Sequence, residues 1–143
     1  MEKIKVLIAD DHRVVREGLA AILKTKEDIH VIGEAQDGAE AVEKARALLP
    51  DVILMDVSMP RMGGVEATRQ VKREFPHIGI VALTMYEEQQ YIFDLVRAGA
   101  TGYLLKDSES SQIVAAIRAI SRGESLIHPP VASKILAEFS LMA

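Results

Sequence analysis

Short, nearly continuous runs of apolar residues alternate along this chain with segments of helical periodicity. The runs lie at residues 6–9, 31–32, 52–55, 80–83 and 103–105. Apolar runs without alternating polar residues are typical of strands that are covered on both faces, as in a parallel sheet. The pattern therefore predicts a series of buried parallel strands.

The segments between the runs carry apolar residues at the spacing of one helix face. The clearest sets are Val15, Leu19, Ile22 and Leu23 in the first segment, and Ile113, Ala116, Ile117 and Ile120 in the last. Such spacing predicts amphipathic helices packed on the strands. The repeated strand–helix order favours an open, doubly wound α/β sheet with right-handed crossovers.

Polar residues and glycine mark where the helices are expected to begin and end. Asp37 followed by Glu40 resembles a capping box at a helix start, and Ser108 can cap the last main helix. Gly123 stands where a left-handed residue would end that helix. Beyond it, residues 125–130 are predicted to be a linker and residues 131–139 a short amphipathic helix.

Length and composition fit one globular domain. Of the 143 residues, 49% are hydrophobic and 27% charged, which is enough apolar material for a core. The absence of cysteine excludes a disulfide scaffold, a thiolate metal site and a cysteine nucleophile. Neither a signal peptide nor an apolar run of membrane-spanning length is recognisable, so we expect a cytoplasmic protein without a membrane partner.

The net charge of −4 arises in the first part of the chain. Residues 1–60 hold 8 Lys and Arg against 12 Asp and Glu, whereas residues 61–143 hold 9 against 9. A nucleic-acid-binding surface needs a basic patch or stripe, and this sequence has none. We therefore expect no nucleic-acid partner for these residues themselves.

Chemically active side chains follow the predicted strands where each one ends. Asp10 and Asp11 end the first strand, Asp56 the third, Thr84 the fourth and Lys106 the fifth. Ligands of open α/β sheets bind outside the carboxyl ends of the strands, so these residues are expected to converge. Three acids would repel one another there, which a divalent cation would relieve. Oxygen ligands without cysteine favour a hard cation such as Mg2+.

These residue types suit phosphoryl transfer. Asp10 and Asp11 can hold the metal and leave Asp56 available as a nucleophile that forms an aspartyl phosphate. The cation and Lys106 would neutralise the oxygens of the phosphoryl group during its transfer.

The motifs around these positions resemble those of the receiver domain of bacterial two-component response regulators. The resemblance covers residues 3–123 and is carried by residues 10–11, 56–64, 83–84 and 102–106. It implies a flavodoxin-like (CheY-like) sheet of five parallel strands in the order 2-1-3-4-5. Domain boundaries follow from it: a receiver domain at 1–123 and a linker at 124–143.

The resemblance also implies residue roles. Asp56 would be the phosphoacceptor, and the Mg2+ ligands would be Asp10, Asp11, Asp56 and the backbone carbonyl of Ser58. Lys106 would contact the phosphoryl group, and Thr84 would donate its hydroxyl to it. Tyr103 matches the aromatic switch residue of the family, which is expected to respond to the movement of Thr84.

Further local features resemble the NarL/FixJ subfamily, whose output domain is a LuxR-type helix-turn-helix. They are residues 10–19, residues 104–107 and the tail from 125 to 139. This implies a transcription regulator truncated before its output domain, with a sensor histidine kinase as partner and a homodimer after phosphorylation. DNA would then be a partner of the full-length protein only.

Alternative functions remain at this point. A stand-alone receiver that acts through protein–protein contacts would carry the same motifs. A haloacid dehalogenase-type hydrolase needs a second acid two residues after its nucleophile, and Ser58 stands there, so we expect a switch rather than an enzyme. A nucleotide-binding domain would need a glycine fingerprint after the first strand, which is missing.

The four histidines, His12, His30, His77 and His128, have no metal-ligand spacing, which favours surface or capping roles.

Overall fold

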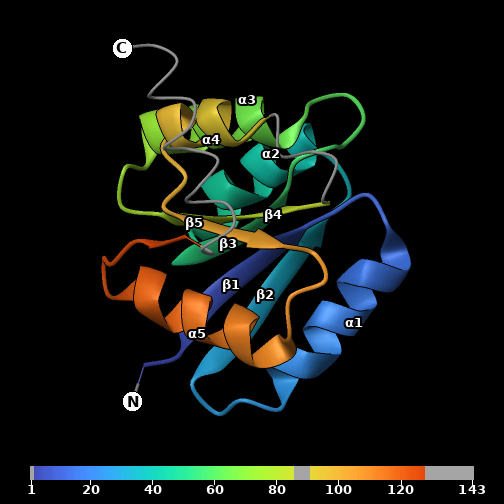
Figure 1. The fold of residues 1–143 in the computed structure, drawn as a ribbon, viewed down its shortest axis with the longest axis vertical. Helices are drawn as coiled ribbons and strands as arrows, with labels where there is room; N and C mark the ends of the chain where they lie inside the picture. Colours follow the sequence, from blue (N-terminus) through green and yellow to red (C-terminus); the bar gives the residue numbers. More distant parts are fainter. Residues whose placement is uncertain (1, 86–90, 128–143) are drawn as a thin grey trace.

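The computed structural model describes residues 2–85 and 91–127. The predicted helix at 131–139 and His128 lie outside these ranges. Strands and helices alternate as predicted (Figure 1). The strands are β1 (Ile4–Ala9), β2 (Ile29–Ala35), β3 (Val52–Asp56), β4 (Gly79–Thr84), β5 (Gly102–Leu105) and β6 (Leu126–Ile127). The helices are α1 (Arg13–Lys24), α2 (Gly38–Leu48), α3 (Gly64–Glu74), α4 (Ile92–Ala98) and α5 (Ser110–Ser121).

The strands form one parallel sheet in the order β2-β1-β3-β4-β5-β6. The predicted order 2-1-3-4-5 is therefore confirmed, but the prediction of a plain linker over residues 125–130 was wrong in part. Leu126 and Ile127 pair with Gly102 and Tyr103 as a sixth strand. The exposed edge of β5 offers unpaired backbone groups, and the chain returning from α5 runs alongside it and pairs with them.

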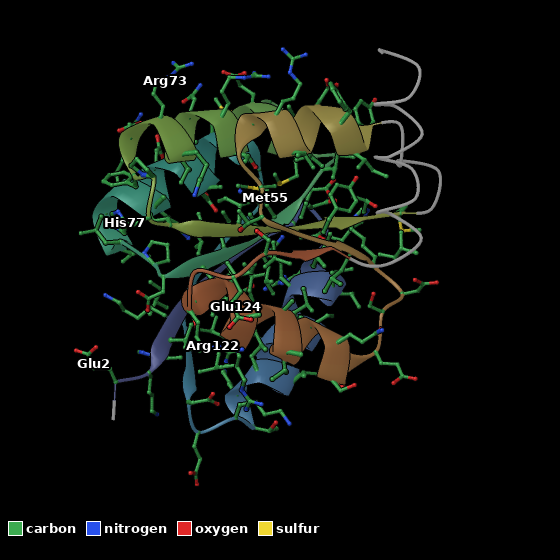
Figure 2. The ribbon with its side chains drawn as sticks, turned by 60° about the vertical axis from the view of Figure 1, so that its left-hand side comes forward. Glu2, Met55, Arg73, His77, Arg122 and Glu124 are labelled. Atoms are coloured by element: carbon green, nitrogen blue, oxygen red, sulfur yellow. The ribbon has the colours of Figure 1, made fainter. Side chains whose placement is uncertain are left out.

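Helices cover both faces of the sheet, which explains the continuous apolar runs. In Figure 1, α2, α3 and α4 lie on one side and α1 and α5 on the other. Successive strand residues alternate between two cores: Leu7 and Ala9 join the α2–α4 side, and Val6 and Ile8 the α1–α5 side. Figure 2 shows the same layers from another direction, with Met55 inside the molecule. No helix in the part of the chain that the structure describes could span a membrane.

The ends of the helices agree with the predictions at two of three places. Asp37 caps α2 by accepting a hydrogen bond from the Glu40 N–H at 2.8 Å. Gly123 follows α5 with a left-handed backbone, φ 84°. The prediction of Ser108 as the cap of α5 was wrong, since that position is Glu109. The N–H of Ser108 donates to the carbonyl of Leu105 in a turn, so the helix begins one residue later.

Candidate acidic site

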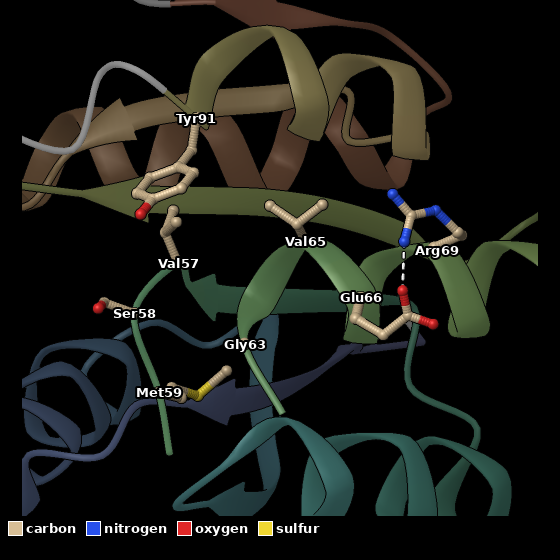
Figure 3. Close-up of a pocket in the computed structure, with 8 residues that line it drawn as sticks. All are labelled: Val57, Ser58, Met59, Gly63, Val65, Glu66, Arg69 and Tyr91. Atoms are coloured by element: carbon tan, nitrogen blue, oxygen red, sulfur yellow. Dashed lines mark hydrogen bonds and ion pairs between the residues drawn. The ribbon is translucent and has the colours of Figure 1, made fainter. Parts of the chain in front are cut away.

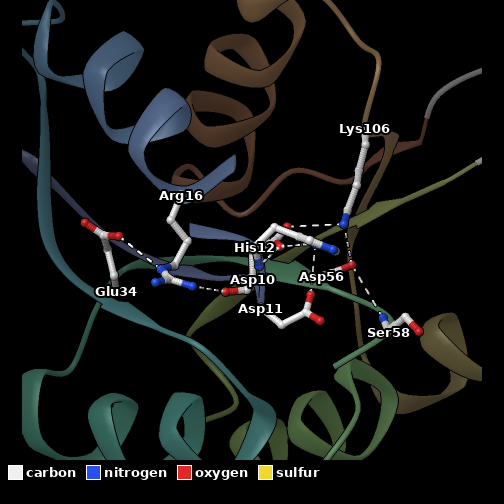
Figure 4. A network of polar contacts seen from close by, with 8 residues as sticks. All are labelled: Asp10, Asp11, His12, Arg16, Glu34, Asp56, Ser58 and Lys106. Carbon is white, nitrogen blue, oxygen red and sulfur yellow. Dashed lines mark hydrogen bonds and ion pairs between the residues drawn. The ribbon is translucent and has the colours of Figure 1, made fainter. Parts of the chain in front are cut away.

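Four of the predicted site residues meet at the carboxyl edge of the sheet (Figure 4). These four central residues are Asp10, Asp11, Asp56 and Lys106. The Lys106 Nζ lies 2.9 Å from Oδ1 of Asp56 and 3.2 Å from Oδ2 of Asp10. The side chains of Asp56 and Asp10 are buried, with 1% and 2% of their surface exposed, and that of Lys106 is 13% exposed. Parallel strands end at the same edge, so residues that are 46 and 50 positions apart along the chain become neighbours.

The carboxylates outnumber the ammonium group at this edge. Ligand atoms of Asp10, Asp11, His12 and Asp56 all lie within 4.8 Å of one another. The Oδ2 of Asp56 is buried and accepts no hydrogen bond from any residue in the described ranges. A buried oxygen of this kind is costly unless a cation or donor reaches it. The donor set of carboxylate oxygens therefore fits a hard divalent cation such as Mg2+.

Burial and repulsion shift the pKa values at the site. Burial raises the pKa of Asp56 to about 7, the charge of Asp10 and the nearby carboxyl of Asp11 act in the same direction, and Lys106 opposes the shift. Burial also works against the charged form of Lys106. Its hydrogen bonds and ion pairs with Asp56 and Asp10 outweigh burial and raise its pKa. Lys106 therefore stays charged and holds two acids that repel each other.

The loop after β1 is fixed by its own polar contacts. Arg16 in α1 donates from Nη1 to the backbone carbonyl of Asp10 at 2.7 Å, and its Nε lies 3.2 Å from Glu34 in β2. The backbone N–H of His12 donates to Oδ1 of Asp10 at 2.8 Å. These bonds hold the first acid in place while its second oxygen faces Lys106.

The loop between β3 and α3 is held by close backbone contacts. The N–H of Gly38 donates to the carbonyl of Met62 at 2.8 Å, and a Cβ on Gly38 would lie 2.2 Å from that oxygen. Arg61, with a left-handed φ of 64°, donates from Nε to Asp37 at 3.0 Å. The loop that follows Asp56 is therefore hydrogen-bonded to the start of α2 at two places.

Thr84, Tyr103 and Ser58 surround the four central residues. Thr84 is buried at the end of β4, and its carbonyl accepts a hydrogen bond from the backbone N–H of Lys106 at 2.7 Å. Tyr103 is 1% exposed and packs in the core on the α4 side. Ser58 is exposed, and its N–H donates to Oδ1 of Asp56 at 3.4 Å.

A shallow groove of about 370 Å³ lies beside the acidic site (Figure 3). It runs between the loop after β3, the start of α3 and Tyr91 at the start of α4. Its lining includes Ser58 and Met59 but none of the four central residues. The groove is therefore a neighbouring surface and not the place where the carboxylates converge.

Sequence reasoning missed His12 and Arg16 as neighbours of the site. His12 was expected to have a surface or capping role. It does occupy the N-cap position of α1, but its Nδ1 also lies 3.2 Å from Oδ1 of Asp10 and 3.1 Å from Oδ1 of Asp11. The adjacency of Asp10, Asp11 and His12 was the available signal. The four histidines themselves have no metal-ligand spacing, so His12 stands out only through the two acids that precede it.

Comparisons with known proteins agree with this fold. Residues 6–118 match the family described as the response regulator receiver domain. The transcriptional regulatory protein LiaR of Bacillus subtilis is 48% identical over 134 residues, 94% of this chain and 64% of LiaR. The chain spans between 58% and 64% of the length of five curated relatives that it matches.

Solved structures give the same result. A LuxR-family two-component response regulator from Aurantimonas matches with a TM-score of 0.88 and 32% identity, over 97% of this chain and 99% of that one. The receiver domain of the putative response regulator NarL from Mycobacterium tuberculosis matches with a TM-score of 0.81 and 36% identity, over 87% and 100%. The chain therefore belongs to the receiver domain family of two-component response regulators, with relatives of the LuxR type.

Proposed function

We propose that Asp56 accepts a phosphoryl group in a Mg2+-dependent reaction, and that the resulting aspartyl phosphate switches the conformation of the domain. The contact of Lys106 with both Asp56 and Asp10 carries this proposal. It pairs a nucleophilic carboxylate with a largely covered ammonium group at the edge of the sheet where ligands of such folds bind. A carboxylate oxygen of Asp56 would bond to phosphorus while the bond from phosphorus to the donor breaks.

The residues that would hold Mg2+ are Asp10, Asp11, Asp56 and the backbone carbonyl of Ser58. When bound, Mg2+ supplies positive charge that offsets the carboxylates and the phosphoryl oxygens. Lys106 would shift its ammonium group to a phosphoryl oxygen, which needs little movement because it already lies 2.9 Å from Asp56. The other positive charge near the phosphoryl group would then be the ammonium group of Lys106.

Thr84 and Tyr103 are the proposed switch. The Thr84 hydroxyl is buried and makes no hydrogen bond within the described part of the chain, so it has a donor to offer to a phosphoryl oxygen. Tyr103 pairs in register with Ala82, two residues before Thr84, on the neighbouring strand. Movement of Thr84 towards the phosphoryl group would change the packing around Tyr103.

Membership of the receiver family supports the proposed partners. The donor would be the phosphohistidine of a sensor histidine kinase, in the cytoplasm. The output would be a LuxR-type DNA-binding domain, since LiaR is named a transcriptional regulatory protein and is longer than this chain. Dimerisation after phosphorylation would couple phosphoryl transfer to DNA binding by the output domain. The domain itself would be a switch and not an enzyme that acts on other substrates.

Labelling with a small phosphodonor tests this proposal. Incubation with Mg2+ and acetyl phosphate should add one phosphoryl group to the wild-type chain and none to Asp56→Asn. Asp51→Asn is the matched control, since Asp51 is an exposed acid that precedes the same strand and should leave labelling intact. Full labelling of Asp56→Asn, or loss of labelling in Asp51→Asn alone, would overturn the assignment.

Turnover of phosphomonoesters tests the hydrolase alternative. Ser58 stands where that class needs a general acid, so we expect no sustained release of phosphate from p-nitrophenyl phosphate. Release over many turnovers that Asp56→Asn abolishes would replace the switch by an enzyme.

A further inference from the structure

His12 places an imidazole at the edge of the acidic site, as Figure 4 shows. Its Nδ1 lies 3.2 Å from Oδ1 of Asp10 and 3.1 Å from Oδ1 of Asp11. The side chain is 66% exposed, so it can turn without disturbing the core. The hydrogen bond from its backbone N–H to Oδ1 of Asp10 at 2.8 Å holds the main chain of His12 beside that carboxylate.

A second observation points to a ligand at this place. The Asp56 side chain is 1% exposed, and its Oδ2 receives no hydrogen bond from the residues of the described ranges. One atom each from Asp10, Asp11, Asp56 and His12 can be chosen so that all four lie within 4.8 Å of one another. The cluster therefore offers three carboxylate oxygens and one imidazole nitrogen as ligand atoms. They lie beside a buried Asp56 oxygen that receives no hydrogen bond within the described ranges.

We propose that His12 is a ligand for transition-metal cations at this site and that it determines which divalent cation the domain prefers. This inference rests on the proposed function, since it concerns the same metal site. Carboxylates and water suit Mg2+, whereas an imidazole nitrogen suits Co2+, Ni2+ and Zn2+. His12 therefore adds affinity for the second group of cations and little for Mg2+.

An ion pair is the competing explanation for the position of His12. In that case a positively charged imidazole would neutralise Asp10 and Asp11 and would compete with any cation. Removal of His12 would then strengthen the binding of Mg2+ and Co2+ alike. Coordination by His12 requires the opposite for Co2+, so the two explanations differ in the direction of the effect.

Titration with Co2+ and with Mg2+, followed by calorimetry, tests the proposal on the purified chain. We expect His12→Ala to weaken Co2+ binding by about tenfold or more, the scale on which a single donor matters at metal sites, and to change Mg2+ binding by less than about twofold. His12→Gln, which keeps a polar side chain without an imidazole, should behave like His12→Ala. Visible absorption of bound Co2+ should change in both variants.

Matched variants locate the effect. His77 is also exposed but precedes β4 at the opposite edge of the sheet, so His77→Ala should bind both cations like the wild-type chain. Asp56→Asn should lose Co2+ affinity, because the site shares that carboxylate. Unchanged Co2+ binding in His12→Ala and His12→Gln, or equal changes for Co2+ and Mg2+, would overturn the proposal.

The failure of the proposed function would look different. If the wild-type chain took no label from acetyl phosphate with Mg2+, the phosphoacceptor role would fall. A selective loss of Co2+ affinity in the His12 variants would still establish the imidazole as a ligand. If labelling succeeded and Asp56→Asn kept its Co2+ affinity, Co2+ would bind elsewhere and only the His12 proposal would fail.

Discussion

A Cβ atom on Gly64 would lie 2.1 Å from the backbone oxygen of Asp56. The first turn of α3 therefore packs directly on the residue proposed to carry the phosphoryl group. The backbone N–H of Gly64 also donates to the carbonyl of Val57 at 2.8 Å, which closes the loop between them. Glycine at this position sets how closely helix and strand approach.

Gly64→Ala is expected to destabilise the fold. The methyl group has to displace backbone, and such overpacking costs about 1–3 kcal/mol of unfolding free energy. Urea unfolding measures this cost, and acetyl phosphate labelling should fall in the same variant because Asp56 is displaced. Gly18→Ala is the control: it lies within α1, and beyond its chain neighbours and the backbone of its own helix no described atom lies within 4 Å of the added Cβ. That change should stabilise the helix by up to about 1 kcal/mol. Equal effects of the two substitutions would contradict the packing argument.

The raised pKa of Asp56 predicts a pH-dependent stability in metal-free buffer. Its folded pKa of about 7 lies above the ordinary 3.8, so the folded state holds the proton more tightly than the unfolded chain. Stability should therefore fall as the pH rises from about 4 to 7, by an amount on the order of a few kcal/mol. Asp56→Asn has no such charge to bury.

Urea unfolding with EDTA at several pH values compares the two proteins. Asp56→Asn should be the more stable at pH 7, and the difference should shrink towards pH 4. A difference that stays constant across this range would show that ionisation of Asp56 is not its cause.

Asp37 should respond to pH in the opposite sense. The backbone N–H of Glu40 and the guanidinium of Arg61 lower its pKa below the ordinary value. Its stabilising contribution is therefore complete above pH 3.8 and is lost as the pH falls through the lower, folded pKa. Asp37→Ala removes the cap and should cost about 1 kcal/mol at pH 7. Thermal unfolding should show that this cost decreases only in strong acid, and a cost that is largest there would refute the assignment.

Thr84→Val should separate stability from signalling. The buried hydroxyl has no hydrogen-bond partner within residues 2–85 and 91–127, so its removal should leave the unfolding free energy unchanged or raise it by about 1 kcal/mol. Thr68→Val in α3 is matched, because Thr68 is equally buried and its hydroxyl also lacks a described partner. NMR shifts at Tyr103 on addition of Mg2+ and acetyl phosphate should be reduced in Thr84→Val only. The same reduction in both variants would remove the special role of Thr84.

Much of the fold was predictable because buried strands have a recognisable local pattern of residues. Strands covered on both faces must be apolar throughout, and the runs from residues 6–9 to 103–105 show this directly. The cap at Asp37 was predictable because its hydrogen-bond partner Glu40 is only three residues away along the chain. At α5 the same spacing is present, but the prediction chose the wrong one of two adjacent polar residues. Ser108 is held in a turn with Leu105, and α5 takes Glu109 as its N-cap, whose N–H donates to the Gln112 side chain at 3.1 Å.

Which residues stand at the ends of the strands can be read from the amino-acid sequence alone, because that depends on the local pattern of apolar and polar positions. How these residues contact one another is visible only in the folded molecule. Lys106 reaches both Asp10 and Asp56, Arg16 secures the Asp10 backbone, and Gly38 fixes the loop after Asp56 through Met62. These contacts depend on strand register, helix placement and side-chain rotamers. Those are set by the packing of the whole core, which no short window of the chain contains.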